Sequence, residues 1–119
     1  MANMKAGIYK GKLQAEVVEI PKPEVGPKDV LVKTVRSAIC GSDVAGVGVE
    51  VGIQFGHETA GYVAEVGREV KEFKEGDRVW INPMHSMPKY KTCQLGGFSE
   101  YIRVPDATLD HNLFKLADT

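Results

Sequence analysis

Two short polar segments contain the residue types that bind metal ions. Cys40 lies in residues 39–43, Ile-Cys-Gly-Ser-Asp, directly after an apolar stretch, and His57 and Glu58 follow a glycine further along the chain. Thiolate sulfur and imidazole nitrogen are preferred ligands of zinc. A catalytic zinc site needs only three protein ligands, because water or substrate takes the fourth position. The two segments therefore predict a metal site that includes Cys40 and His57.

Each of these residues alone also has an ordinary structural explanation. A small buried thiol is common in protein cores, and a single histidine is more often a structural side chain than a ligand. The Ser42 hydroxyl fits a turn equally well. The metal-site interpretation therefore depends on both segments occurring together in one short chain.

The elements that would position these residues are short strands. Runs rich in valine, isoleucine and tyrosine are separated by glycine and proline at close intervals, and no stretch shows a long helical period. Many short strands with turns between them favour a closed or nearly closed barrel, since closure leaves few strand edges unpaired. The pattern predicts strands at residues 5–9, 13–20, 30–38, 61–66, 78–81 and 98–104. Cys40 would then follow the third strand, and His57 would precede the fourth.

The two polar segments and the glycines after them resemble one protein superfamily. Residues 4–6, 67–79 and 96–101 follow the same order and rough spacing as in the zinc-dependent medium-chain dehydrogenase/reductase (alcohol dehydrogenase) superfamily, in its GroES-like amino-terminal domain. The resemblance covers essentially the whole chain. It implies a mainly β fold, a GroES-like partly open β-barrel with few short helices. It also implies that residues 1–119 form the amino-terminal part of a catalytic domain, with no Rossmann domain in this chain.

The resemblance assigns a role to five residues. Cys40 and His57 resemble the first two ligands of the catalytic zinc, and Glu58 resembles a carboxylate that ligates the zinc directly or lies just behind it. Ser42 resembles the hydroxyl that passes the substrate proton outward. Asp43 resembles a carboxylate that holds the other ring nitrogen of the histidine and so fixes its tautomer.

The resemblance also implies a reaction. Zinc lowers the pKa of bound water to about 7, and an alcohol bound there should likewise lose its proton more easily. Hydride would then pass from a small-molecule alcohol or polyol to NAD(P), held by a domain absent here. Three alternatives stay open: a stand-alone GroES-like structural or binding module, a degenerate subunit without activity, and a metal-free quinone reductase relative. Whether this chain alone is an enzyme is left open.

The chain departs from the family pattern in two places. Many relatives have four closely spaced cysteines that bind a structural zinc, but residues 80–95 contain only Cys93, so we expect no structural zinc. An oligomer contact through that lobe is therefore in doubt, and a homo-oligomer or a separate cofactor-binding domain stays open as a partner. Relatives also supply a further zinc ligand, cysteine or glutamate, and then a doubly wound domain with a glycine-rich turn; neither is found in residues 1–119, so we expect an incomplete catalytic zinc site. The glycines at residues 46–52 do not match such a turn, because the third glycine comes one residue too late.

Composition limits the remaining classes of partner. The 119 residues are 43% hydrophobic and 26% charged, with a formal net charge of −1, which is ordinary for a globular domain. No basic stripe is present to neutralise a phosphate backbone, so we expect no nucleic acid partner. No signal-peptide core or membrane-spanning run is found, and we expect a cytoplasmic protein without a membrane partner.

Overall fold

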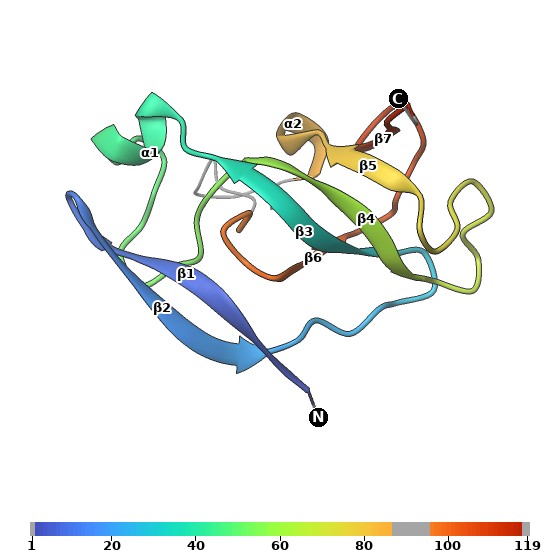
Figure 1. The fold of residues 1–119 in the computed structure, drawn as a ribbon, viewed down its shortest axis with the longest axis horizontal. Helices are drawn as coiled ribbons and strands as arrows, with labels where there is room; N and C mark the ends of the chain where they lie inside the picture. The colour runs from blue at the N-terminus through green and yellow to red at the C-terminus, as the bar shows by residue number, and fades with distance from the viewer. Residues whose placement is uncertain (1, 87–95, 118–119) are drawn as a thin grey trace.

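The computed structural model describes residues 2–86 and 96–117, which form two antiparallel sheets (Figure 1). β1 and β2 form a two-stranded sheet, and the other strands form a five-stranded sheet with the order β6-β3-β4-β5-β7. The strands are β1 (Asn3–Gly11), β2 (Gln14–Pro21), β3 (Val30–Ala38), β4 (Glu58–Val66), β5 (Arg78–Ile81), β6 (Tyr101–Val104) and β7 (Leu113–Lys115); the helices are α1 (Gly41–Ala45) and α2 (Pro83–Ser86).

The core lies on one face of the five-stranded sheet. Alternate residues of β3, β4 and β5 point to this face, as the two-residue period of a strand requires. Val30, Val32, Val63, Val79 and Ile81 are each at most 1% exposed. Burying a side chain of this size contributes about 1.5–3 kcal/mol. This core fixes the position of β3 against β4, the two strands that lead to the polar segments.

The register of β3 against β4 brings the two polar segments together. The strands are antiparallel, with Val30 opposite Val66 at one end and Ala38 opposite Glu58 at the other. The end of β3 therefore lies beside the start of β4. Cys40 follows the first of these strands by two residues, and His57 immediately precedes the second.

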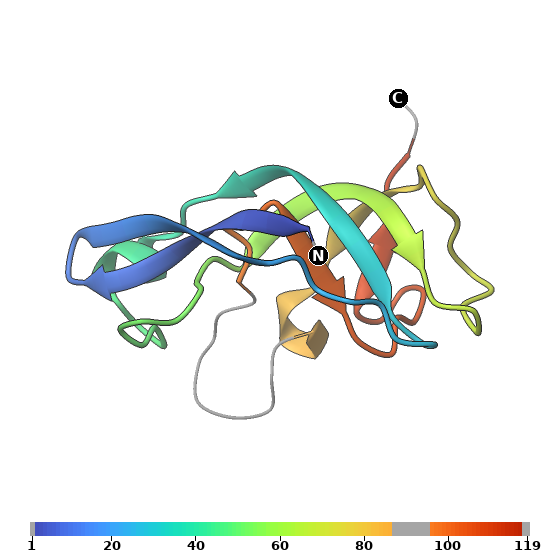
Figure 2. The same ribbon diagram turned by 90° about the horizontal axis from the view of Figure 1, so that it is seen from below.

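The β1–β2 hairpin is attached to the larger sheet at only a few backbone positions. Isolated bridges join Ala6 to Ser99 and Ile8 to Gln54, and the Gly7 N–H donates to the carbonyl oxygen of Phe98 at 2.6 Å. In Figure 2 the tip of the hairpin extends beyond the end of the five-stranded sheet. The barrel is thus partly open, which confirms the expected fold class.

The predicted strands differ from the observed strands at several boundaries. The second begins at Gln14, because Leu13 has a φ of +59° and belongs to the hairpin turn. The fourth begins at Glu58 instead of Gly61, because cross-strand pairing with β3 extends it backward. The sixth begins at Tyr101, after residues that bend between the sheets. β7 was not predicted, since three residues are too short to show a period.

The described residues contain no helix that is both long and apolar enough to span a membrane.

Candidate metal centre

Cys40 lies in a tight turn between β3 and α1. Its carbonyl oxygen accepts hydrogen bonds from the N–H groups of Asp43 at 3.0 Å and Val44 at 3.4 Å. Its own N–H donates to Asp43 Oδ2 at 2.9 Å. The helix ends at Gly46, whose φ of 75° is in the left-handed region that glycine adopts without strain. Backbone and side-chain hydrogen bonds thus hold Cys40 in one place.

The second oxygen of Asp43 faces the histidine. Asp43 is 4% exposed, and its Oδ1 lies 3.5 Å from His57 Nδ1. Among the described residues, Oδ1 accepts no hydrogen bond at normal distance. A buried carboxylate needs a partner, so it favours a proton on His57 Nδ1. The nitrogen that would bind a metal is then Nε2.

Three candidate ligand atoms lie close together. The sulfur of Cys40, a ring nitrogen of His57 and a carboxylate oxygen of Glu58 are all within 4.8 Å of one another. Ligand atoms of a tetrahedral zinc site are separated by about 3–4 Å, so a small closure of these side chains would reach that geometry. Cys40 and His57 are half-buried, while Glu58 is exposed. The donor set of thiolate, imidazole and carboxylate fits zinc.

The surroundings of the Cys40 thiol lower its pKa. Hydrogen bonds from the Ser42 side chain and backbone, and a further one with the His57 ring, lower the pKa of Cys40 below the usual value of a thiol. Partial burial and the charge of Glu58 oppose this effect without reversing it. Because the thiolate is the form that binds metal, this environment favours the ligand state of Cys40.

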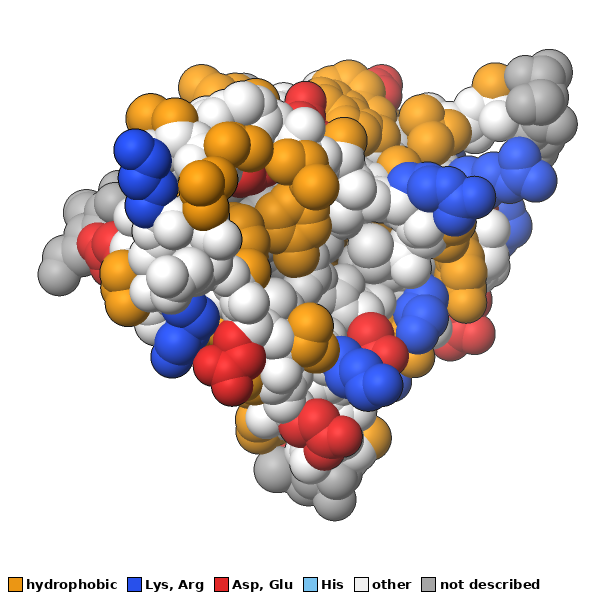
Figure 3. Space-filling view, turned by 60° about the vertical axis from the view of Figure 1, so that its left-hand side comes forward, with side chains coloured by type: hydrophobic (Ala, Val, Ile, Leu, Met, Phe, Trp, Pro, Cys, Tyr) orange, Lys and Arg blue, Asp and Glu red, His pale blue; other side chains and the backbone are white. Residues whose placement is uncertain are grey.

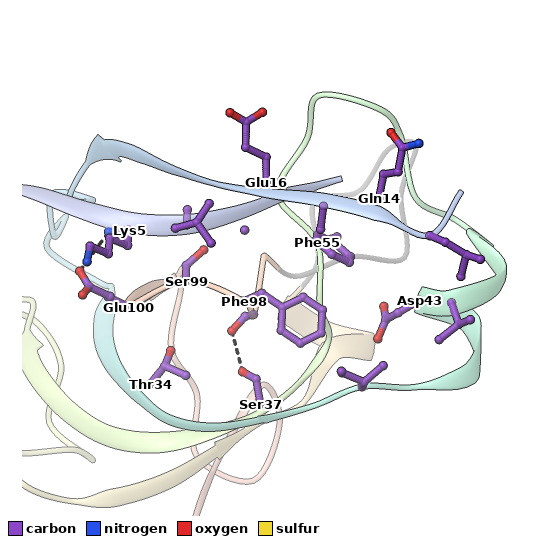
Figure 4. Close-up of a pocket in the computed structure, with 18 residues that line it drawn as sticks. Lys5, Gln14, Glu16, Thr34, Ser37, Asp43, Phe55, Phe98, Ser99 and Glu100 are labelled. Atoms are coloured by element: carbon purple, nitrogen blue, oxygen red, sulfur yellow. Dashed lines mark hydrogen bonds between the residues drawn. The ribbon is translucent and has the colours of Figure 1, made fainter. Parts of the chain in front are cut away.

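An apolar groove lies between the hairpin and the end of β3. It has a volume of about 750 Å³, and its lining includes Phe55, Phe98 and, at one end, Asp43. Figure 3 shows hydrophobic side chains gathered around a hollow on this face, and Figure 4 shows Asp43 and Phe98 beside it. Cys40 and His57 do not line the groove. Asp43 therefore borders both the groove and the candidate metal centre.

The glycines between the two ligand segments do not form a nucleotide-binding turn. Gly46 ends α1, and the residues after it form turns that lead to β4 without opening another helix. A dinucleotide-binding turn would precede a helix and bind phosphate at its N-terminus. Cys93, the residue on which the prediction about a structural zinc depends, lies outside the described residues.

Comparison with known proteins identifies the family. The family model described as "Alcohol dehydrogenase GroES-like domain" matches residues 26–116. The chain belongs to this family of alcohol dehydrogenase domains. The family that the motifs resemble, the GroES-like domain of the zinc-dependent medium-chain dehydrogenases/reductases, is thereby confirmed.

Individual relatives of the GroES-like domain are dehydrogenases. The chain is 33% identical to an L-threonine 3-dehydrogenase of Streptomyces avermitilis, with 78% of this chain and 34% of that protein covered. It is 32% identical to a sorbitol dehydrogenase of Bacillus subtilis, with 82% and 30% covered. The crystal structure of 2R,3R-butanediol dehydrogenase from Bacillus subtilis matches with a TM-score of 0.77 and 30% identity, over 97% of this chain and 41% of that one. This GroES-like chain thus spans about a third of the length of these curated relatives.

The candidate ligands of this alcohol dehydrogenase domain were predicted from the sequence, but the polar contacts at the strand ends beside them were not. Ser37 and Thr59 form a hydroxyl pair directly behind the ligand segments, with the two oxygens 2.9 Å apart. Both residues are ordinary in strands, and their common partner, the carbonyl of Gly97, is far away in sequence. The sequence signal for this pair was weak: one polar residue near the end of β3, Ser37, and one near the start of β4, Thr59.

Proposed function

We propose that this chain is the zinc-binding part of the catalytic domain of an alcohol or polyol dehydrogenase. The observation that carries the proposal is the convergence of Cys40, His57 and Glu58 ligand atoms within 4.8 Å. The buried Asp43 carboxylate at His57 Nδ1 adds support, because such a contact orients a metal-binding histidine and raises its basicity. The dehydrogenase names of the relatives agree with this assignment.

In the proposed reaction each residue has a separate task. Zinc, when bound, supplies a Lewis acid that makes a coordinated alcohol easier to deprotonate. Cys40 and His57 would hold the ion, and Glu58 would ligate it or lie beside it. Ser42 lies next to Cys40, and its hydroxyl receives the substrate proton and passes it toward solvent. Asp43 would keep the proton on His57 Nδ1 and so leave Nε2 available for the metal.

The substrate class follows from the relatives and from the site. Threonine, sorbitol and butanediol, the compounds in the relatives' names, are all alcohols. We therefore propose a small alcohol or polyol as substrate and NAD(P) as hydride acceptor. The acceptor would be bound by the part of the dehydrogenase that these relatives have beyond the matched region. We propose residues 1–119 as one GroES-like unit of that enzyme.

The experiment is a measurement of bound zinc per chain. The wild-type protein, Cys40→Ala and His57→Ala are loaded with zinc, freed of excess metal and analysed by atomic emission. A matched control is Cys93→Ala, which removes the other cysteine. We expect zinc in the wild type and in the control, and a loss of most of it in the two ligand variants. Equal, substantial zinc content in all four proteins would contradict the assignment of Cys40 and His57 as ligands. A wild-type protein that retains no zinc would overturn the proposal and favour a metal-free structural module.

A further inference from the structure

A group of partly buried hydrogen bonds lies at the ends of the two strands that lead to the candidate metal centre. The Ser37 hydroxyl donates to the carbonyl oxygen of Gly97 at 2.6 Å, drawn as a dashed line in Figure 4. The Thr59 hydroxyl oxygen lies 2.9 Å from Ser37 Oγ and 3.5 Å from the same carbonyl. A serine hydroxyl has one hydrogen to donate, so Thr59 is the donor in the contact with Ser37. We call these three groups the hydroxyl clamp.

The hydroxyl clamp lies where the two ligand segments leave the sheet. Ser37 and Thr59 are opposite each other in the β3–β4 register, and the next pair, Ala38 and Glu58, is the last one. Cys40 comes three residues after Ser37, and His57 two residues before Thr59. The clamp therefore lies at the end of the paired strands, from which both ligand segments extend.

The loop that contains Gly97 holds the histidine segment from a second side. The Gly97 N–H donates to the carbonyl oxygen of Gly56, the residue before His57, at 2.9 Å. A side chain at position 97 would collide with Thr59 Oγ1, and one at position 56 would approach the backbone nitrogen of Phe98 to 2.9 Å. The N–H of Gly97 thus contacts the segment before β4, and its carbonyl oxygen contacts the end of β3. Only glycine fits at position 97, because a side chain there would collide with Thr59.

We propose that Ser37 and Thr59 are positioning residues of the metal centre. The inference rests on the proposed zinc function. Thr59 is 1% exposed, and a valine there would fill the same space without directional bonds. Hydrogen bonds to hydroxyl groups restrict distance and angle more narrowly than apolar packing does. A metal site needs its ligand distances within about 0.2 Å, so the clamp holds Cys40 and His57 at the spacing that the metal requires.

The test compares metal binding with stability in variants of the full chain. Cobalt(II) is titrated into each protein, and its visible absorption gives both the dissociation constant and the ligand geometry. We expect Thr59→Val to weaken cobalt binding about fivefold or more and to change the spectrum. Thr59→Ser, which keeps the hydroxyl, should restore both. Urea unfolding of the metal-free proteins measures stability separately.

The matched control is Thr34→Val. Thr34 lies on the same strand as Ser37, and its hydroxyl oxygen is buried with no hydrogen-bond partner among the described residues. This variant removes a hydroxyl of the same size and should leave the cobalt dissociation constant and spectrum unchanged. If Thr59→Val fails to fold, Ser37→Ala takes its place, because Ser37 is only half-buried.

The outcomes separate the two proposals. In one outcome the wild type binds cobalt, and Thr59→Val, or Ser37→Ala in its place, shows the same dissociation constant and spectrum. This result would overturn the positioning role and leave the zinc function intact. A wild-type protein that binds no cobalt would overturn the metal centre and the role of the clamp with it. Lower stability with unchanged cobalt binding would assign the clamp to folding alone and would also overturn the positioning role.

Discussion

Asp43→Asn should separate the orientation of His57 from the stability of the fold. The carboxylate uses both oxygens: Oδ2 accepts from the Cys40 N–H at 2.9 Å, and Oδ1 faces His57 Nδ1 at 3.5 Å. An asparagine has only one acceptor oxygen. If that oxygen stays on Cys40, the amide NH₂ points at Nδ1 and requires a proton on Nε2, the nitrogen that should bind metal. If the amide flips, two donors meet at Cys40.

The expected losses of zinc affinity and of stability in Asp43→Asn depend on which of the two Asp43 contacts is lost. Removing the group that orients a metal-binding histidine weakens metal affinity by about 10–100-fold. The effect on stability should be smaller, about 1 kcal/mol, because asparagine keeps the volume and one hydrogen bond. Loss of the buried charge also removes part of its desolvation cost. A large loss of zinc affinity with a small loss of stability is therefore the expected pattern.

The assay is competition with a zinc chelator at neutral pH, with urea unfolding of the metal-free proteins in parallel. Asp43→Ala serves as the control, because it removes both contacts and should lose affinity and stability together. Wild-type zinc affinity in Asp43→Asn would refute the reasoning, since it would mean that the tautomer of His57 does not depend on this carboxylate.

Two further predictions concern pH. Ser42→Ala should raise the pKa of Cys40, because the largest effect that lowers it is the hydrogen bond of the Ser42 side chain; the thiolate absorbance, followed against pH in a variant without the other cysteine, measures the shift. Burial tends to raise the pKa of Asp77, but hydrogen bonds from Lys74 and the charge of that lysine lower it overall. The ionised Asp77 carboxylate therefore stabilises the fold at a pH above its unfolded pKa of about 4. This contribution is lost as the pH falls through the lower pKa of the folded protein. Asp77→Asn should therefore lose less unfolding free energy between neutral and acidic pH than the wild type does, as measured by urea unfolding; an equal loss would contradict the assignment.

The sequence was sufficient to predict the β class and to single out Cys40, His57 and Glu58, whose ligand atoms the fold brings together, because both depend on local patterns. It was insufficient for the start of β4, where Glu58 is part of the strand only through its pairing with Ala38. A Gly-His-Glu segment has no strand preference of its own. The hydroxyl clamp was missed for a similar reason, since the Ser37 hydroxyl and the Gly97 carbonyl are 60 residues apart. Contacts of this kind follow from tertiary packing, which no local pattern contains.

The charges around the candidate metal centre give an independent argument for a cation. Asp43 and Glu58 are both acidic, and the environment of Cys40 favours its thiolate despite the nearby charge of Glu58. Among the described residues, no lysine or arginine forms an ion pair with either carboxylate. The Cys40 sulfur and a Glu58 carboxylate oxygen lie within 4.8 Å of each other, and a thiolate and a carboxylate at this distance repel in the absence of a counterion. A bound divalent cation reverses the sign of this interaction and stabilises each anionic ligand. The proposed zinc site would offset the charges of Glu58 and the Cys40 thiolate, whereas Asp43 already has a structural partner in the Cys40 N–H.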